Sequence, residues 1–311
     1  MEHSKTAETG AGPRSAGVVG ALGSDWASKV IVVTGATQGI GLVTARELGR
    51  KGARVLIVAR DEKRGTAVRD ELIEKTGNAR FELLLCDFSS QKQIRALAKQ
   101  LHEVTDRIDV LVNNAGAIFT ERALTEDGIE RTFAVNHLGY FLLTTLVLDL
   151  LRAAASRAGG ARVVNVASRA HTRGKLDLDD INVEKRSYVG MLVYGSTKLA
   201  NILFTAELAK RLAGDGISVN ALHPGVVRTG FGRNTPGIFK FLVGLATPFM
   251  ITAEEGAETT IYLASSSEVD GVTGKYFDKC KPVQPNQAAR DATLAAELWT
   301  KSETLVGAAA S

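Results

Sequence analysis

The sequence predicts an α/β protein with a single doubly wound domain, in which a mostly parallel, seven-stranded sheet is covered by helices on both faces. Three observations lead to this prediction. Short β-branched runs alternate with longer stretches of helical periodicity, the runs are apolar at nearly every position, and polar or glycine-rich turns follow them. Runs that are apolar throughout are typical of parallel strands buried on both faces.

The expected elements follow one another without an internal repeat or a linker. Strands are expected at residues 29–34, 54–59, 81–86, 109–113, 161–167, 217–222 and 271–277. Helices are expected near residues 40–51, 62–76, 90–104, 127–152, 191–213 and 252–265. We therefore expect one domain over residues 24–281, with a flexible tail before it (1–23) and a polar tail after it (282–311).

Composition narrows the class of function. Apolar residues form 45% of the 311, and the 38 basic residues are interspersed with 34 acidic ones, which argues against a nucleic-acid partner. The distant Cys86 and Cys280 fit a reducing compartment, and no two histidines have a spacing suited to a metal. The first 23 residues lack the apolar core of a signal peptide, and the longest apolar run, 141–151, is about half a membrane span. We expect a cytoplasmic protein without a metal or a transmembrane segment.

The first strand leads into the turn TGATQGIG, in which Gly35, Gly39 and Gly41 open a helix. Glycines let the backbone turn tightly and approach a pyrophosphate, whose charge is favoured at a helix N-terminus. Ligands in doubly wound sheets bind beyond the carboxyl ends of the strands. The position of this turn therefore predicts a dinucleotide-binding (Rossmann) fold.

The second strand ends in Ala59 and Arg60, where an NAD site usually offers a carboxylate to the ribose 2′-hydroxyl. A guanidinium at this place favours the 2′-phosphate of NADP. We interpret Asp61 as the N-cap of the next helix, and Lys63 and Arg64 either add to the same positive field or are solvated surface residues. The sequence thus predicts NADP(H), with NAD(H) as the less favoured cofactor.

Further polar residues fall at the ends of the third and fourth strands. Asp87 is placed to accept a hydrogen bond from the adenine amino group, and it also suits a helix cap. The turn NNAG, residues 113–116, brings small residues and amides to the expected position of the adenosine ribose.

Three more segments supply polar groups to the same crevice. Asn136 lies in an otherwise apolar helix face, so it is either a structural hydrogen-bond hub or the holder of an ordered water. Ser168 follows the fifth strand, and the rigid turn with Pro224 and Gly225 follows the sixth. His137 and His223 are interpreted as structural.

The stretch YGSTK places Tyr194 and Lys198 four residues apart, on one face of the expected helix 191–213. A free phenol has a pKa of about 10, so it is a poor base at neutral pH unless a neighbouring cation favours its anion. Together with Ser168, this pair forms a candidate catalytic set.

These motifs, in this order, resemble the short-chain dehydrogenase/reductase family from about Asp25 to Phe277. The stretches VNHLGYFLLT, SRAHTRGKLDLDDIN and KLANILF resemble its retinol-dehydrogenase-like and WW-domain oxidoreductase-like branch. The resemblance implies that Tyr194 is the acid/base, that Lys198 binds the nicotinamide ribose and lowers the Tyr194 pKa, that Ser168 orients the substrate oxygen, and that Asn136 holds a water in a proton relay. The residues expected to contact the cofactor are Gly35, Thr37, Gly39, Ile40, Gly41, Arg60, Asp87, Phe88, Asn114, Ala115, Gly116, Tyr194, Lys198, Pro224, Gly225, Val227 and Thr229.

The chain departs from this family pattern at Gly195, where many relatives carry a bulkier side chain. Glycine there weakens the start of the helix and suggests a roomier pocket. The absence of an amino-terminal hydrophobic anchor, which membrane-bound retinol dehydrogenases usually have, argues against a retinoid substrate.

Two long connections flank the expected site. The charged insert between Ser168 and Tyr194 is expected to cover one side, and the substrate loop 225–251 the other. The apolar residues in 231–251 favour a hydrophobic substrate, with a subunit contact or a peripheral membrane contact as alternatives. The helix around 141–151 is apolar nearly all round, which suggests packing against a second subunit in a homodimer or homotetramer.

The leading hypothesis is an NADP(H)-dependent oxidoreductase that transfers hydride between nicotinamide and a hydrophobic ketone, aldehyde or secondary alcohol. Two alternatives stay open: a cofactor-binding redox sensor or scaffold without turnover, and an epimerase or dehydratase that uses bound cofactor. The combination of Asn136, Ser168, Tyr194 and Lys198 favours the enzyme, because a sensor has no need of all four.

Overall fold

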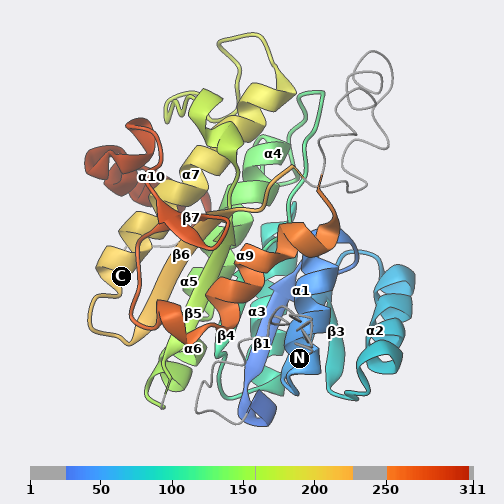
Figure 1. Ribbon diagram of the computed structural model, residues 1–311. Helices are drawn as coiled ribbons and strands as arrows, with labels where there is room; N and C mark the ends of the chain where they lie inside the picture. The colour runs from blue at the N-terminus through green and yellow to red at the C-terminus, as the bar shows by residue number, and fades with distance from the viewer. Residues whose placement is uncertain (1–25, 158, 227–250, 308–311) are drawn as a thin grey trace, which may run out of the picture.

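The computed structural model describes residues 26–157, 159–226 and 251–307, and it is built on one eight-stranded sheet (Figure 1). The strand order is β3-β2-β1-β4-β5-β6-β7-β8, and every neighbouring pair is parallel except β7 and β8. This arrangement confirms the predicted doubly wound class, with one strand more than expected. The strands are β1 (Val30–Thr34), β2 (Arg54–Ala59), β3 (Phe81–Leu85), β4 (Val110–Asn113), β5 (Ala161–Val166), β6 (Ile217–His223), β7 (Tyr276–Asp278) and β8 (Lys281–Val283).

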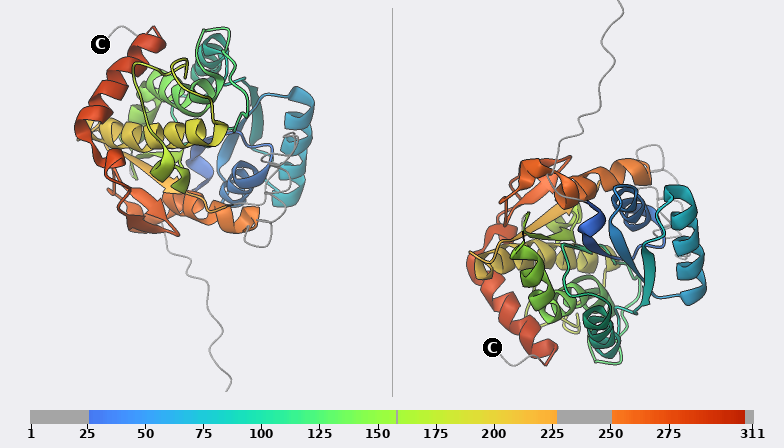
Figure 2. Two further views of the ribbon diagram at one scale, coloured as in Figure 1. Left: turned by 90° about the horizontal axis from the view of Figure 1, so that it is seen from above. Right: turned by 90° about the horizontal axis from the view of Figure 1, so that it is seen from below.

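Helices cover both faces of the sheet, as the views from above and below show (Figure 2). One face carries α1 (Gly39–Arg50), α2 (Glu62–Thr76) and α9 (Ala253–Ser265). The other carries α3 (Gln91–Val104), α5 (Gly139–Leu146) and α7 (Gly190–Arg211), with α10 (Ala292–Leu305) packed against α7. The remaining helical segments are η1 (Trp26–Ser28), α4 (Arg131–Phe133), η2 (Ala134–Leu138), α6 (Leu148–Ala155), η3 (Arg169–Arg173), η5 (Ser267–Val269) and η6 (Ala288–Arg290).

The central strands are buried on both sides, as their apolar sequences predict. Every residue of β1, β4 and β5 is buried. Because successive side chains of a strand point to opposite faces, Val30 and Val32 join the core under α3, α5 and α7, whereas Ile31 and Val33 join the core under α1, α2 and α9.

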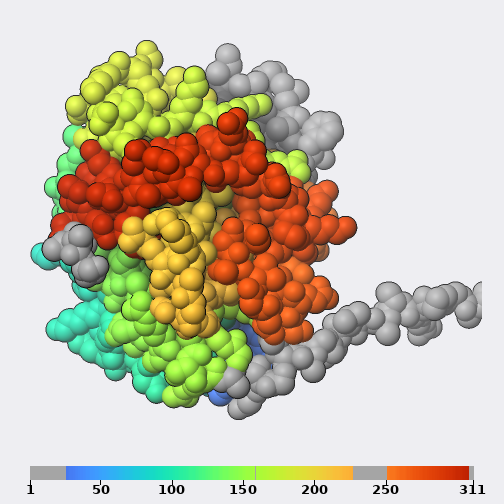
Figure 3. Space-filling model, turned by 90° about the vertical axis from the view of Figure 1, so that its left-hand side faces the viewer, coloured from blue at the N-terminus to red at the C-terminus, as the bar shows by residue number. Residues whose placement is uncertain are grey.

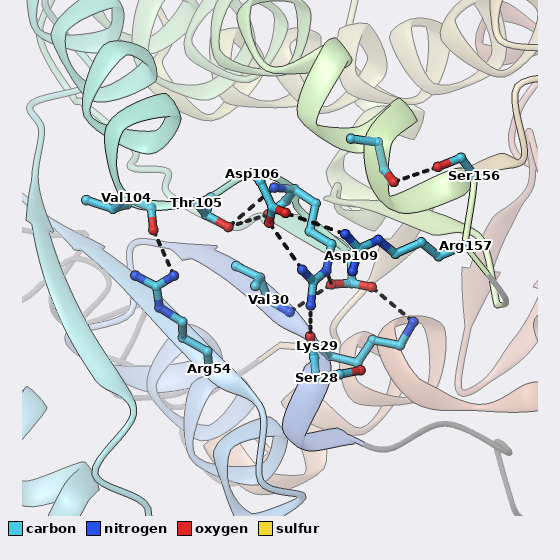
Figure 4. A network of polar contacts seen from close by, with 12 residues as sticks. Ser28, Lys29, Val30, Arg54, Val104, Thr105, Asp106, Asp109, Ser156 and Arg157 are labelled. Atoms are coloured by element: carbon cyan, nitrogen blue, oxygen red, sulfur yellow. Dashed lines mark hydrogen bonds and ion pairs between the residues drawn. The ribbon is translucent and has the colours of Figure 1, made fainter.

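A charged network ties the strands together at their amino ends (Figure 4). The buried Asp109 carboxylate accepts hydrogen bonds from the Val30 backbone N–H at 2.8 Å and from the Lys29 ammonium at 3.0 Å. Arg107 lies 3.4 Å from the same carboxylate. This network joins the start of β1 to the start of β4. It therefore lies at the edge of the sheet opposite the carboxyl edge, where the sequence predicts the site.

The chain reverses its direction of winding between β1 and β4, which pair directly although two strands separate them in sequence. Such a switch point creates a crevice at the carboxyl ends of the strands. The turns after β1 and β4 therefore border the site that the sequence predicts.

The helix expected at 127–152 is interrupted. A π-helical turn, η2, lies between α4 and α5, and the chain bends again at Val147 before α6. A π-turn inserts one residue into the helical repeat, which shifts the side chains that follow it. Apolar periodicity alone does not show such an insertion.

The expected polar C-terminal tail is wrong. After β8 the chain forms α10, whose Ala295, Leu298 and Trp299 are buried in the core, and Figure 3 shows this red segment as a band across one side of the molecule. Asp291 caps the helix by accepting hydrogen bonds from the N–H groups of Thr293 and Leu294. The spacing of the buried residues follows a helical period, a signal that the polar composition obscured.

Helix α10 also accounts for the apolar surface of α5. The Trp299 ring lies 4.9 Å from the ring of Phe141 on α5 and 6.0 Å from that of Phe204 on α7. The surplus apolar surface from which we predicted a second subunit is thus covered by the same chain. The homo-oligomer stays a prediction, but the apolar surface of α5 is no longer an argument for it.

No single helix within the described ranges is long and apolar enough to cross a membrane, although the bent pair Arg131–Leu146 and Leu148–Ala155 together reaches the required length and composition.

Candidate active site

The turn between β1 and α1 is shaped by close backbone contacts. Gly35 has a φ of +66°, and a Cβ atom on Gly41 would lie 2.4 Å from the Gly35 carbonyl oxygen. The Asn114 side chain holds the turn by donating to the carbonyl oxygens of Thr34 and Gly35, at 2.9 and 3.1 Å. Glycine is therefore required at both positions.

The same turn is suited to a dinucleotide. Helix α1 begins at Gly39, and the side chain of its N-cap residue, Gln38, makes no capping hydrogen bond. Thr37 and Ile40 flank this N-terminus and are partly exposed. N–H groups of a first helical turn that no side chain caps are donors for a phosphate, so this chain's residues fit the pyrophosphate of a nicotinamide dinucleotide.

Two arginines flank the turn at the end of β2. Asp61 caps α2 by accepting from the Arg64 backbone N–H at 2.7 Å, as predicted. The Arg64 guanidinium donates to the Gln38 side chain at 2.8 Å, so it lies directly beside the glycine-rich turn. Arg60 and Lys63 are exposed. From the sequence, Arg64 is expected either to add to the positive field or to be a solvated surface residue, whereas the structure brings it into contact with the turn.

The residues after β3 take different places from those expected. Asp87 does not cap α3; its carboxylate accepts from the backbone and hydroxyl of Ser89, and Ser90 is the cap. The Phe88 side chain is buried in the core against Gly139, where a Cβ atom would lie 2.6 Å from the Phe88 ring. The Asp87 carboxylate remains partly exposed at the carboxyl edge.

The turn after β4 is fixed to β1. The Thr34 hydroxyl accepts hydrogen bonds from the backbone N–H groups of Asn114 and Ala115, at 2.9 and 3.0 Å. At Gly116, a Cβ atom would lie 3.1 Å from the Asn136 side-chain oxygen and 3.7 Å from the Lys198 ammonium. The predicted cofactor residues of this turn therefore lie directly beside the predicted catalytic residues.

Ser168, Tyr194 and Lys198 come together at the carboxyl end of β5. Ser168 follows the strand and caps η3, and its hydroxyl forms a hydrogen bond with the Tyr194 phenol. The Lys198 ammonium lies 5.5 Å from the centre of the Tyr194 ring and donates to the Val166 carbonyl oxygen at 2.8 Å. The predicted pairing of Tyr194 and Lys198 on one face of a helix is the observed one.

Burial dominates the protonation of this pair. It raises the pKa of Tyr194 to about 12, against the opposing effect of the Ser168 hydrogen bond. It also lowers the pKa of Lys198 to about 7. The expected lowering of the Tyr194 pKa is therefore not found among the protein groups alone, because removing water from a phenolate outweighs the nearby hydrogen bond.

Asn136 is a hydrogen-bond hub. Its side-chain oxygen accepts from the Ala117 N–H at 2.8 Å, and its side-chain nitrogen donates to the Ala117 carbonyl at 2.8 Å and to the Thr197 hydroxyl at 3.2 Å. These contacts tie the loop after β4 to α7. Of the two roles predicted for this amide, the hub is the one that these contacts show.

The turn after β6 lies at the carboxyl edge of the sheet. Gly225 has a φ of +86°, and a Cβ atom there would meet the Ile251 side chain at 2.3 Å. The preceding His223 accepts a hydrogen bond from the Arg169 backbone N–H, at 3.2 Å from its Nδ1, and burial lowers its pKa to about 4. Pro224 is partly exposed beside it, whereas Val227, Thr229 and nearly all of the substrate loop 225–251 lie outside the described residues.

Gly195 has a structural cause. A Cβ atom there would lie 2.7 Å from the Ala170 carbonyl oxygen and 3.2 Å from the Gly174 backbone nitrogen. The glycine lets the segment after Ser168 pack directly on α7, so its absent side chain does not enlarge the pocket. This corrects the sequence-based interpretation.

The insert between Ser168 and Tyr194 folds back on the protein. Its carboxylate Asp180 accepts from the Glu184 backbone N–H at 2.7 Å, and Arg122, beyond β4, pairs with Glu184 at 2.8 Å. The insert then leads to the first turn of α7, where Met191 and Leu192 are exposed. An apolar rim thus lies one helical turn before Tyr194.

Two contributors to the site escaped the sequence analysis. The fully buried Tyr140 has its ring centre 5.7 Å from the Lys198 ammonium. His171 lies behind Ser168, with its Nδ1 2.7 Å from the Ser168 carbonyl oxygen. Neither has a sequence signal, because a tyrosine in an apolar helix and a histidine in a charged loop are common.

Comparison with known proteins agrees with this geometry. The model of the short chain dehydrogenase family matches residues 29–236. Human retinol dehydrogenase 12 is 43% identical over 279 residues, covering 90% of this chain and 86% of the relative. The WW domain-containing oxidoreductase of Gallus gallus is 37% identical over 292 residues, covering 91% and 69%.

Solved structures show the same likeness. An uncharacterized protein from Mycobacterium paratuberculosis is 36% identical with a TM-score of 0.72, covering 91% of this chain and 95% of that one. RhlG of Pseudomonas aeruginosa, in a complex with NADP, is 28% identical with a TM-score of 0.65, covering 82% and 96%. The chain belongs to the short-chain dehydrogenase/reductase family of oxidoreductases.

Proposed function

We propose that the chain is an NADP(H)-dependent oxidoreductase that interconverts a hydrophobic ketone or aldehyde and the corresponding alcohol, with Tyr194 as the acid/base. The observation that carries this proposal is the convergence of Ser168, Tyr194 and Lys198 beside the glycine-rich turn, at the carboxyl edge of the sheet. The two groups of residues come from separate parts of the chain and meet at the switch point between β1 and β4.

The protein groups have distinct tasks in this mechanism. Bound NADP(H) supplies or accepts the hydride at the nicotinamide. Ser168 orients the substrate oxygen, and Tyr194 gives its phenolic proton to that oxygen in reduction or takes the alcohol proton in oxidation. Lys198 holds the ribose and provides positive charge next to the phenolate that forms, which compensates for the loss of water around Tyr194.

The preference for NADP rests on charge at the end of β2. Arg60 is exposed next to the turn, and Arg64 contacts Gln38 within it. Guanidinium groups pair well with a phosphate, and the neighbouring Asp61 carboxylate is engaged as the cap of α2. The NADP complex of the RhlG structure supports the same assignment.

The hydrophobic substrate is supported by the apolar rim of the site. Val189, Met191 and Leu192 are exposed at the start of α7, and Val226 is exposed just after Gly225. Exposed apolar side chains near a binding site favour an apolar ligand. Several relatives are named retinol dehydrogenases, so retinal belongs among the compounds to test.

A reduction screen tests the proposal. The purified protein is mixed with NADPH and a panel of apolar aldehydes and ketones, including retinal, while the absorbance of the reduced nicotinamide is followed; the matching alcohols are tested with NADP. Net turnover separates an oxidoreductase from an epimerase, a dehydratase or a sensor. NADPH binding without net turnover in either direction, over the whole panel, would contradict the proposed function.

A further inference from the structure

A chain of buried hydrogen bonds links α10 to the active site. The Ser302 hydroxyl on α10 lies 3.0 Å from His137 Nε2, and His137 Nδ1 lies 3.3 Å from the Asn201 side-chain oxygen. The Asn201 side-chain nitrogen donates to the Asn136 carbonyl oxygen at 3.0 Å. All four residues have an exposed fraction of 0%.

The direction of each hydrogen bond in this series follows from the Asn136 carbonyl group. Because the Asn136 carbonyl can only accept, Asn201 must present its NH₂ group to it and its oxygen to His137. An oxygen that faces Nδ1 requires a proton on Nδ1. Burial lowers the pKa of His137 to about 4, so the ring is neutral and Nε2 is an acceptor.

The last link then follows. Ser302 has two partners within reach, His137 Nε2 at 3.0 Å and the Leu298 carbonyl at 2.8 Å, but its hydroxyl has only one proton. Donation to Leu298 would leave Nε2 buried without a partner, whereas the Leu298 carbonyl is within a helix and has a backbone donor. The Ser302 hydroxyl therefore donates its hydrogen bond to His137 Nε2.

The last residue of this series of hydrogen bonds, Asn136, is a member of the proposed catalytic set. Asn136 occupies the π-turn η2, where the helical hydrogen bonds span one residue more than usual, as in the bond from the Gly139 N–H to the Ala134 carbonyl. Its side chain holds the loop after β4 and reaches Thr197, which is next to Lys198. A displacement of the Asn136 carbonyl would therefore be felt by the loop that borders both the cofactor turn and the catalytic lysine.

We propose that Ser302, His137 and Asn201 are positioning residues, through which α10 holds the π-turn and Asn136 in their active geometry. The effect of these residues on catalysis rests on the proposed function, whereas the hydrogen-bond polarity and the hold of α10 on the π-turn do not. Helix α10 is thus part of the active-site framework as well as a cover for the core.

The first test reads the protonation of His137 directly. In ¹⁵N-labelled protein the imidazole nitrogen shifts of His137, identified by their loss in His137→Gln, are expected to show a neutral ring protonated at Nδ1. A ring protonated at Nε2 would overturn the proposed polarity.

The second test compares two hydroxyl deletions on α10. Ser302→Ala removes the donor to His137, and Thr300→Ala is the matched control, because the exposed Thr300 hydroxyl donates to the Ala296 carbonyl of its own helix. Ser302→Ala is expected to speed the amide hydrogen exchange of η2, residues 134–138, by about tenfold and to lower kcat by a similar factor, with little change in the KM for NADPH. Thr300→Ala is expected to match the wild type in both.

The outcomes separate this inference from the proposed function. Equal exchange rates in the two variants would refute the hold of α10 on the π-turn, whether or not the protein turns over a substrate. Faster exchange with an unchanged kcat would refute the catalytic role. A wild-type protein without turnover on any carbonyl would contradict the proposed function, and the NMR and exchange results would still decide the hydrogen-bond chain.

Discussion

The Lys198 ammonium lies 5.5 Å from the centre of the Tyr194 ring, and the Val166 carbonyl fixes it there through a hydrogen bond of 2.8 Å. Lys198 is thus anchored to the end of β5, the strand that also delivers Ser168. The sheet therefore sets the relative positions of the phenol, the ammonium and the hydroxyl. This arrangement leads to predictions that mutagenesis can check.

Tyr194→Phe is expected to remove the acid/base while leaving the cofactor site intact. Turnover should fall by at least about a hundredfold, the usual contribution of a general acid or base, and the dissociation constant for NADPH should change little. Steady-state kinetics and fluorescence titration measure the two quantities. Retention of more than about a tenth of the wild-type rate would count against the phenol as proton donor.

Burial of Lys198 predicts a pH dependence of stability. Its pKa is lowered from 10.5 to about 7 in the folded protein, so between these values the unfolded chain binds more protons and stability rises with pH. Lys198→Met lacks this dependence. The unfolding free energy of the wild type should therefore rise by about 2 kcal/mol relative to that of Lys198→Met between about pH 7 and pH 9. Urea unfolding at both pH values checks this, and a constant difference would mean an ordinary lysine pKa.

Arg64 is expected to discriminate between cofactors. Arg64→Ala should weaken NADPH binding by about tenfold or more and leave NADH binding nearly unchanged, because a charge-assisted hydrogen bond to the 2′-phosphate is lost. Arg69→Ala is a suitable control, since Arg69 lies on the same helix and pairs with Asp70. Parallel loss of affinity for both cofactors would place Arg64 in a structural role.

Gly195→Ala distinguishes close packing from a roomy pocket. A Cβ atom would lie 2.7 Å from a backbone oxygen that cannot rotate away, so we expect a loss of about 1–3 kcal/mol in stability. Thermal and denaturant unfolding measure the change. Unaltered stability with a changed substrate range would restore the pocket interpretation.

Trp299 is expected to stabilise the fold from outside the predicted domain. Trp299→Ala should cost about 3–5 kcal/mol, because it removes a buried ring packed on Phe141 and Phe204. The exposed Thr293→Ala on the same helix serves as control. Sedimentation of both variants also shows whether uncovering α5 promotes self-association.

The sequence allowed the sheet and the pairing of Tyr194 with Lys198 to be predicted, because both depend on local patterns. The glycines of the β1–α1 turn are imposed by contacts such as that between Gly41 and the Gly35 carbonyl, and Tyr194 and Lys198 share a face through helical spacing alone. Asp61 as the cap of α2 followed from a local rule of the same kind.

The features that were missed depend on contacts between distant residues. The role of Gly195 is set by Ala170, the place of Phe88 by Gly139, and the covering of α5 by α10. The pKa of Tyr194 depends on how much water the folded site excludes, which no spacing reveals. Helix α10 is an exception, because its apolar period was legible in the sequence and its polar surroundings were given too much weight.

Helix α10 also bears on how the protein is made. Translation proceeds from the amino end, so every other described element leaves the ribosome before α10 does. Until then the aromatic surface formed by Phe141 and Phe204 stays uncovered, and an exposed apolar surface of this kind favours aggregation. A nascent chain can form its sheet before α10 is made, but it closes its core and gains the proposed support of Asn136 only once α10 has left the ribosome.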